Sequence, residues 1–325
     1  MNSPPATGVP AVSAAPATPE FRPGPMSEPM DFSRHPLCAL GVASALGIVH
    51  GATGTAAAPA RMMEADLLAA LRRGGLLVRW RDAVAGGPLL TPSAAATLPD
   101  LLEDLARATE RTLAAGERPL VLGGDHSIAA GTWRGVARWC RRQGTEAGLI
   151  WVDAHLDAHT PATTPSGNCH GMPLAALLGE GGGAWAGHAG AVLDPRRVCV
   201  VGAHSFEAAE SALLARHGVR VFALEEVRRR GLAEVWAEAL AIAGTPFGVS
   251  LDLDVLDSAL APAVSTPAGP GLAPAELVAV WRGLLRRPDL LGLEIVEYHP
   301  GRDRDGATLA AVEALLDAAS RQVSE

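Results

Sequence analysis

The sequence lacks the features that mark membrane, nucleic-acid-binding and disulfide-rich proteins. No stretch approaches the ~18 consecutive apolar residues that a membrane-spanning helix requires, so no membrane association is expected. The 27 Lys and Arg residues are outnumbered by 35 Asp and Glu residues, and the resulting net charge of −8 argues against nucleic acid as a partner. The four cysteines are too widely spaced for a CxxC pair or a small disulfide framework: Cys38, Cys140, Cys169 and Cys199. This usage predicts a cytoplasmic protein.

The first 35 residues differ in composition from the rest of the chain. They are rich in Pro, Ala and Ser, and no basic segment precedes an apolar core, so they do not read as a signal peptide. Two interpretations are open: a disordered tail, or upstream sequence that is not normally translated, with Met26 or Met30 as the start. We expect residues 1–35 to be a disordered tail and residues 36–325 to form one domain.

From Pro36 onward, short apolar runs alternate with longer segments of helical periodicity. A composition of 48% hydrophobic and 19% charged residues is that of a globular protein with a substantial core. The expected strands are 37–41, 76–80, 119–122, 149–152, 198–201, 219–223, 247–253 and 291–294. The expected helices are 61–73, 98–115, 127–142, 206–217, 225–243, 274–287 and 305–319. This alternation predicts a single-domain α/β fold, with a doubly wound, mostly parallel sheet of about eight strands flanked by helices in three layers.

Acidic residues and histidines follow three of the apolar runs. The segments are GGDHS after residue 122, DAHLDAH after residue 152 and LDLDVLD after residue 250. Ligands of open α/β sheets bind outside the carboxyl ends of the strands, and residues two apart on a strand face the same side. Asp153, His155 and Asp157 can therefore converge on one point. Asp252 and Asp254 can do the same.

Taken singly, each of these residues has an ordinary interpretation. An Asp at a strand end is usually a turn former or a helix N-cap, and a lone histidine such as His126 is more often a supporting residue than a ligand. Together they would repel one another unless cations neutralise them. Four of the carboxylates balance two divalent ions: Asp153, Asp157, Asp252 and Asp254. Oxygen-rich ligation with imidazole and no thiolate favours Mn²⁺, and two such ions can hold a hydroxide for attack.

The motifs GGDHS, DAHxD and SxDxDxxD, in this order, resemble those of the ureohydrolase (arginase/agmatinase) family. The match begins near Leu37 and continues to the C-terminus, so residues 36–325 would be the catalytic domain. The resemblance implies two Mn²⁺ ions per subunit and a homotrimer or homohexamer. It implies that one ion is held by His126, Asp153, Asp157 and Asp252, and the other by His155, Asp153, Asp252 and Asp254.

One further segment looks more like arginase than agmatinase, and another is similar to a substrate-binding segment of the whole family. In TTPSGNCHG, the resemblance places binding of a substrate α-carboxylate on Thr164, Ser166 and Asn168, and proton transfer on His170. Without the metal motifs, SGN would be read as a simple turn. In LEIVEYHP, the resemblance places binding of the guanidinium on Glu297, which a carboxylate can do through charge-assisted hydrogen bonds; otherwise Glu297 would be an exposed strand-end acid.

Three positions depart from the arginase pattern at the substrate tail. His159 stands where many arginases have Asn, and Glu207, with Glu210 three residues later, stands in a loop that is usually rich in Asp. The expected reaction is hydrolysis of L-arginine to L-ornithine and urea by a metal-bridging hydroxide, with proton transfer through Asp157 and His170. The alternatives are an agmatinase or guanidinobutyrase, a hydrolase of formiminoglutamate type, and an inactive assembly partner.

Overall fold

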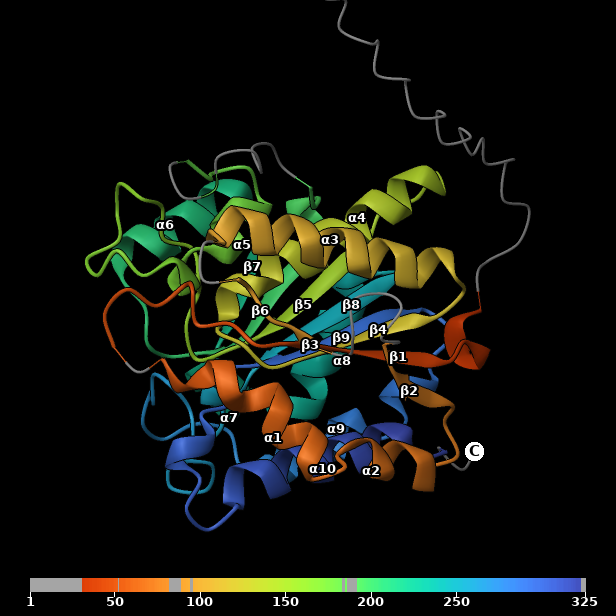
Figure 1. Ribbon diagram of the computed structural model, residues 1–325. Coiled ribbons are helices and arrows are strands. Elements are labelled where there is room, and N and C mark those ends of the chain that lie inside the picture. Colours follow the sequence, from red (N-terminus) through yellow and green to blue (C-terminus); the bar gives the residue numbers. More distant parts are fainter. Residues whose placement is uncertain are drawn as a thin grey trace, which may run out of the picture.

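The computed structural model describes residues 31–51, 53–81, 89–93, 96–182, 185 and 192–322. In these residues all paired strands run parallel in one nine-stranded sheet of order β2-β1-β4-β9-β8-β5-β6-β7, with β3 beside β1 (Figure 1). The strands are β1 Leu37–Val42, β2 Val78–Trp80, β3 Leu89–Leu90, β4 Arg118–Leu122, β5 Gly148–Val152, β6 Val198–Ala203, β7 Arg220–Ala223, β8 Phe247–Asp252 and β9 Leu290–Val296. The predicted doubly wound parallel sheet is confirmed, and β3 is a two-residue addition to the eight expected strands.

Helices cover both faces of this sheet (Figure 1). One layer holds α3 Leu98–Ala114, α4 Ala129–Arg142, α5 Pro173–Leu177 and α6 Ala208–His217. The other holds α1 Ala58–Glu64, α2 Leu68–Arg73, α7 Leu224–Arg230, α8 Leu232–Ala243, α9 Pro274–Trp281 and α10 Ala307–Ser320. The alternation of side chains along β5 explains why both layers are needed. Leu149 and Trp151 belong to one apolar cluster, whereas Ile150 and Val152 belong to the cluster on the opposite face.

Three expected helices are interrupted. The segment 61–73 is split between α1 and α2 at Asp66, which has a φ of 46°, and 225–243 is split between α7 and α8 at Gly231, with a φ of 86°. The segment 274–287 ends as an α-helix at Trp281 and continues as a 3-10 turn, Leu284–Arg286. Apolar periodicity continues through each break, so the sequence pattern did not reveal the change in backbone direction. Among the described residues, no helix is both long and apolar enough to cross a bilayer.

The packed chain begins earlier than expected. Phe32–Arg34 form a 3-10 helix, and the buried ring of Phe32 lies edge-on to Trp139, with 5.9 Å between the ring centroids. The backbone N–H of Phe32 also donates to Pro288 at 2.8 Å. The expected tail boundary at residue 35 is therefore wrong for residues 31–35. Residues 1–30, the remainder of the expected tail, lie outside the described residues.

The strand order brings five carboxyl ends together. β9 lies between β4 and β8, and β5 and β6 follow on the other side of β8. Asp252 at the end of β8 pairs in register with Val296 at the end of β9, so Glu297 follows directly beside the acidic end of β8. Segments that are far apart in sequence therefore converge at one edge of the sheet, where the side chains described below gather.

Candidate active site

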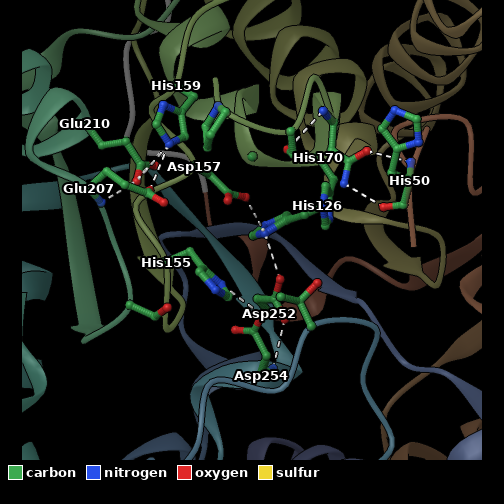
Figure 2. A pocket seen from close by; sticks show the side chains of 16 residues that line it. His50, His126, His155, Asp157, His159, His170, Glu207, Glu210, Asp252 and Asp254 are labelled. Atoms are coloured by element: carbon green, nitrogen blue, oxygen red, sulfur yellow. Dashed lines mark hydrogen bonds and ion pairs between the residues drawn. The ribbon is translucent and has the colours of Figure 1, made fainter. Parts of the chain in front are cut away.

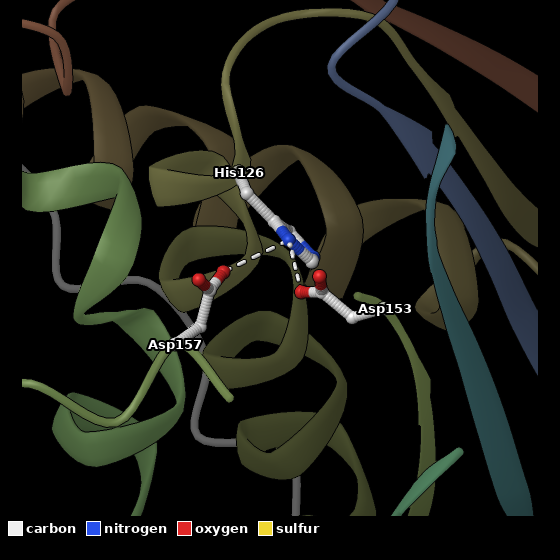
Figure 3. A group of neighbouring side chains, drawn as sticks. All are labelled: His126, Asp153 and Asp157. Carbon is white, nitrogen blue, oxygen red and sulfur yellow. Dashed lines mark ion pairs between the residues drawn. The ribbon is translucent and has the colours of Figure 1, made fainter. Parts of the chain in front are cut away.

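A first cluster surrounds the imidazole of His126. Its Nδ1 atom lies 2.9 Å from Asp157 Oδ2, 3.2 Å from Asp153 Oδ2 and 3.1 Å from Asp252 Oδ2 (Figure 3 shows the first two). All four side chains are buried. One nitrogen and three carboxylate oxygens thus face a common point. The residues that carry them follow or end β4, β5 and β8.

A second cluster shares Asp153 with the first. His155 Nδ1 lies 3.0 Å from Asp254 Oδ2 and 3.5 Å from Asp153 Oδ1, so Asp153 directs one carboxylate oxygen towards each histidine. Asp252, whose Oδ2 faces His126, accepts the backbone N–H of Asp254 through its Oδ1 at 2.8 Å, so it also contacts the segment that carries Asp254. The structure therefore brings together all six residues that the sequence analysis assigned as metal ligands, Asp252 through its contact with His126 (Figure 2 labels five of them).

The turn after β4 aims His126 at this point. Gly123 and Gly124 have φ values of 85° and 86°, and a Cβ atom on Gly123 would lie 2.6 Å from Pro59. Only glycine fits such a conformation without strain. The buried Asp125 then accepts the backbone N–H groups of Ser127 at 3.0 Å and Gly47 at 3.1 Å. It starts the 3-10 helix His126–Ile128 rather than facing the clusters.

The buried aspartates of the two clusters shift one another's pKa values. Burial, together with the charges of two neighbouring aspartates, raises the pKa of Asp252 well above its ordinary value. Burial and the charge of Asp153 raise the pKa of Asp157 to about 6. Burial alone would also raise the pKa of Asp153, but the neighbouring imidazoles of His126 and His155 lower it. These aspartates can all be ionised together only if positive charge lies between them.

The donor set fits divalent cations. His126 Nδ1 and Asp157 Oδ2 are buried without a hydrogen-bond partner within the described part of the chain, although they lie 2.9 Å apart. Buried polar atoms of this kind normally have partners, and a shared metal ion would supply one to both. Carboxylate oxygens with imidazole nitrogen and no thiolate match the preferences of Mn²⁺ better than those of structural Zn²⁺.

Glu297 lies directly behind the clusters. Its Oε1 accepts the backbone N–H of His126 at 2.7 Å and contacts His170 Nδ1 at 3.0 Å, while its Oε2 accepts the hydroxyl of Ser265. The side chain is buried, so it is not the exposed acid of the alternative interpretation. Its φ of 66° and that of Asp157, 48°, are unusual for residues other than glycine. Such conformations persist where the surrounding structure enforces them, often at functional sites.

A cavity of about 430 Å³ opens onto both clusters (Figure 2). Eleven of its lining residues are sequence-predicted site residues: His126, His155, Asp157, His159, Ser166, Asn168, His170, Glu207, Glu210, Asp252 and Asp254. Three predicted site residues are not part of the described lining: Asp153, Thr164 and Glu297. The hydroxyl of Thr164 accepts the backbone N–H of Gly167 at 3.0 Å. His50, Ser205 and Thr266 line the cavity and were not assigned to the site from the sequence. They come from loops without a metal motif, so only their position in space identifies them.

Comparison with known proteins agrees with this arrangement. The arginase family model matches residues 36–320. The chain belongs to the arginase family. An arginase from Bacillus caldovelox is 39% identical over 219 residues, which make up 66% of this chain and 72% of that protein. The crystal structure of an arginase from Bacillus subtilis has a TM-score of 0.80 at 30% identity and covers 89% of this chain and 99% of its own.

This family membership makes the protein an arginase-type ureohydrolase, an enzyme that hydrolyses guanidino C–N bonds. A formiminoglutamase from Trypanosoma cruzi, solved with Mn²⁺, is more distant, with a TM-score of 0.68 at 21% identity, covering 89% of this chain and 95% of its own. That likeness extends to the fold alone. It does not favour formiminoglutamate over a guanidino compound as the substrate.

The SGN segment of this arginase family member is tied to the loop at 47–50. Asn168 Oδ1 accepts the backbone N–H groups of Val49 at 2.8 Å and His50 at 2.9 Å, and its Nδ2 donates to His50 O at 2.9 Å. The backbone N–H of His170 donates to Gly47 O at 3.2 Å. Most of the hydrogen-bonding groups of the Asn168 side chain are therefore bound to this loop. The hydroxyl of Ser166 accepts the backbone N–H of Asn168 at 3.2 Å, its one hydrogen bond to the residues that the structure describes.

His159, Glu207 and Glu210 gather at the other side of the cavity (Figure 2). His159 Nε2 lies 2.9 Å from Glu207 Oε2 and 3.4 Å from Glu210 Oε2, and its Nδ1 lies 3.1 Å from Thr163 Oγ1. Glu210 is buried, and its oxygens accept the backbone N–H groups of Ala158 at 3.1 Å and Glu207 at 3.0 Å. Glu207 is 59% exposed and is the acid of this group that is open to a ligand.

Proposed function

We propose that the protein hydrolyses L-arginine to L-ornithine and urea at a centre of two Mn²⁺ ions per subunit. The observation that carries this proposal is the position of Asp153, which directs one oxygen to the His126 cluster and the other to the His155 cluster. Two clusters joined by a shared carboxylate are what a pair of bridged ions requires. When bound, such ions supply a hydroxide at neutral pH.

Six side chains would hold the two ions. One site would consist of His126, Asp153, Asp157 and Asp252, and the other of His155, Asp153, Asp252 and Asp254. The distances of 2.9–3.5 Å between ligand atoms support the first set, and in the second set the grouping of His155 with Asp153 and Asp254. Asp252 is included in the second set because of the family resemblance. The neutral histidines and four ionised aspartates would balance two divalent ions, which removes the repulsion that raises the aspartate pKa values.

Glu297 would orient the guanidinium carbon towards the metal centre. Its contacts with His126, His170 and Ser265 hold the carboxylate in place and leave an acceptor position on Oε2 for a guanidinium N–H. Burial by itself lowers the pKa of His170, but the hydrogen bond and charge of Glu297 outweigh it and raise the pKa to about 9. A protonated His170 can donate a proton to the leaving amine, and Asp157 would accept the proton released by attack.

The other side of the cavity would recognise the amino-acid part of the substrate. Glu207 would bind the α-ammonium group, and His159 and Ser166 would donate to the α-carboxylate. Their position on the cavity wall supports these roles. Thr164, Asn168 and Glu210 would hold the surrounding backbone, because their side chains already bind backbone groups of neighbouring loops. This assigns the three residues a supporting role within the predicted substrate site.

A comparison of substrates tests the proposal. The Mn²⁺-loaded protein is assayed for urea release from L-arginine, agmatine, 4-guanidinobutyrate and L-homoarginine. We expect L-arginine to have the highest kcat/KM. We expect Glu207→Gln to lower kcat/KM for arginine about tenfold or more while changing that for 4-guanidinobutyrate little, because 4-guanidinobutyrate keeps the guanidinium but lacks the amino group that Glu207 would bind. A wild-type preference for agmatine or guanidinobutyrate would contradict the arginine assignment. Release of formamide from formiminoglutamate without urea from any guanidine would replace it.

The proposal includes an oligomeric state and a cellular location. A homotrimer or homohexamer is inferred from the family resemblance, and light scattering coupled to size-exclusion chromatography tests it by giving the mass of the assembly. A cytoplasmic location is supported by the four cysteines, none of which is paired with another and three of which are buried. Fractionation of the producing cells tests the location. A monomer, or a protein recovered outside the cytoplasm, would contradict the respective inference.

A further inference from the structure

A second cavity lies towards the edge of the sheet opposite the metal clusters. It has a volume of about 170 Å³ and is lined by residues of β1, β2 and the C-terminal half of α3. Cys38 of β1 and Arg79 of β2, which pair in register, line it, and so does Glu117, which directly precedes β4. Because β1 and β4 run parallel, their amino ends lie at this edge, whereas the proposed metal ligands follow the carboxyl ends.

The described lining of this cavity is rich in arginine. Three guanidinium groups, those of Arg79, Arg81 and Arg111, line it together with one carboxylate, that of Glu117. Arg79 holds this carboxylate in a bidentate pair, with Nε 2.8 Å from Oε1 and Nη2 2.6 Å from Oε2. The pair is neutral as a whole. The other two arginines therefore leave an excess of two positive charges among the described lining residues, in a chain whose net charge is −8.

Arg81 and Arg111 come from different elements and line the same cavity. Arg81 follows β2, and its backbone N–H donates to Ala39 O of β1 at 3.0 Å, which holds the residue against the sheet. Arg81 is only 7% exposed, whereas Arg111, in the last turn of α3, is open to solvent. Burial, and then the charge of Arg111, lower the pKa of Arg81. An anion bound between the two guanidinium groups would offset this repulsion.

We propose that this cavity binds a small dianionic oxyanion of the phosphate type, either free phosphate or the phosphate group of a metabolite. Arg81 is the buried anchor of the site and Arg111 the exposed second donor. Planar guanidinium groups bind two oxygens of such an anion through charge-assisted hydrogen bonds, and a dianion matches the excess of two charges. The volume is below the range of about 300–1,000 Å³ that is typical of drug-sized ligands, which favours a small anion. The site does not depend on the proposed metal centre.

Calorimetry at constant ionic strength tests the proposal. Inorganic phosphate and glycerol 3-phosphate are titrated separately into the Mn²⁺-loaded protein and into the chelated protein, with chloride as the balancing salt. The variants are Arg81→Gln and Arg111→Gln. The matched control is Arg107→Gln, which removes the same charge from α3 one turn earlier, where Arg107 pairs with Glu103 outside the cavity lining. Chemical unfolding confirms that each variant is folded. Arg111→Gln decides the test if the buried Arg81 cannot be replaced.

We expect one phosphate per chain to bind with the same affinity whether or not Mn²⁺ is present. Arg81→Gln and Arg111→Gln should each weaken binding about tenfold or more, and Arg107→Gln should change it little. Tighter binding of inorganic phosphate would identify free phosphate as the ligand, and tighter binding of glycerol 3-phosphate would identify the phosphate group of a metabolite.

Three results would overturn the site. The first is the absence of saturable binding to the wild type. The second is wild-type affinity in folded Arg111→Gln, which would show that the anion does not bind between the arginines. The third is binding that requires Mn²⁺, which would assign the anion to the metal centre. None of these results would remove the proposed hydrolysis of arginine, which is measured separately by urea release.

Discussion

The carboxamide of Asn168 pairs with the backbone of His50 through both of its ends: Oδ1 accepts from His50 N and Nδ2 donates to His50 O, each at 2.9 Å. The loop held in this way also accepts the backbone N–H of His170 through Gly47. Asn168 therefore supports one wall of the cavity and the position of the proposed proton donor. If Asn168 instead contacted the substrate carboxylate, its replacement would affect arginine, which has that carboxylate, more than agmatine, which lacks it.

Replacing Asn168 distinguishes the two roles. Asn168→Ala removes three hydrogen bonds and should lower kcat/KM about tenfold or more, to a similar extent for arginine and agmatine, because the wall serves both substrates. The measurement is the pair of kcat/KM values, with Ser166→Ala for comparison, which should affect arginine selectively. A loss confined to arginine in Asn168→Ala would show that its side chain binds the α-carboxylate directly.

Ser265 is expected to matter through Glu297. Its hydroxyl donates to Glu297 Oε2, and Arg302 holds the carbonyl oxygens of Val264 and Ser265 at 2.5 Å and 2.9 Å, so the hydroxyl is firmly placed. Ser265→Ala should lower kcat/KM for a guanidino substrate by about 10–100-fold, the cost of one hydrogen bond to a charged group. The loss should appear mainly in KM, with two Mn²⁺ ions still bound. Ser265→Thr should recover part of it.

An unchanged KM in Ser265→Ala would contradict this account of Glu297. Loss of Mn²⁺ from the same variant would show that Ser265 supports the metal clusters instead. Metal analysis of the variant beside its steady-state kinetics separates these outcomes.

The sequence could predict site residues that lie close together on one strand end, but not residues that distant loops bring to the site. Asp153, His155 and Asp157 were predictable because strand geometry places residues two apart on one face and α/β sheets bind ligands at strand ends. Their division into two clusters, and the role of Glu297, came only from the family resemblance. The role of Glu297 stays a prediction.

Residues brought in by loops could not be found in this way. His50 and Thr266 line the cavity from loops that carry no motif, and Ser265, next to Thr266, contacts Glu297. The break at Asp66 was missed for a related reason. The apolar spacing of α1 continues into α2, and only the backbone conformation shows that the helix stops.

The pairing of α3 and α4 predicts a pH-dependent contribution to stability. Arg138 donates two hydrogen bonds to Glu103, at 3.0 Å and 2.7 Å, and these lower the pKa of that carboxyl from 4.5 to about 2. Because the folded pKa lies below the unfolded value, the stabilisation is complete above about pH 4.5 and disappears as the pH falls towards 2. Glu103→Gln should therefore lower the free energy of unfolding at pH 7 by about 1 kcal/mol, a difference that shrinks below pH 4.5.

Urea unfolding at several pH values measures this difference, and a double-mutant cycle with Arg138→Gln isolates the pair. A destabilisation by Glu103→Gln that stays constant between pH 7 and pH 3 would show that the ion pair is not its source.

The central claim, that two metal ions between β4, β5 and β8 carry the hydrolysis, is tested most directly by titrating Mn²⁺ into the chelated protein. Bound Mn²⁺ and urea release from L-arginine are measured on the same samples. We expect activity to be absent without metal, to rise with loading and to level off at about two ions per chain, and Asp252→Ala to remove it. Full urea release from the protein after chelation, with no Mn²⁺ detected, would contradict the account.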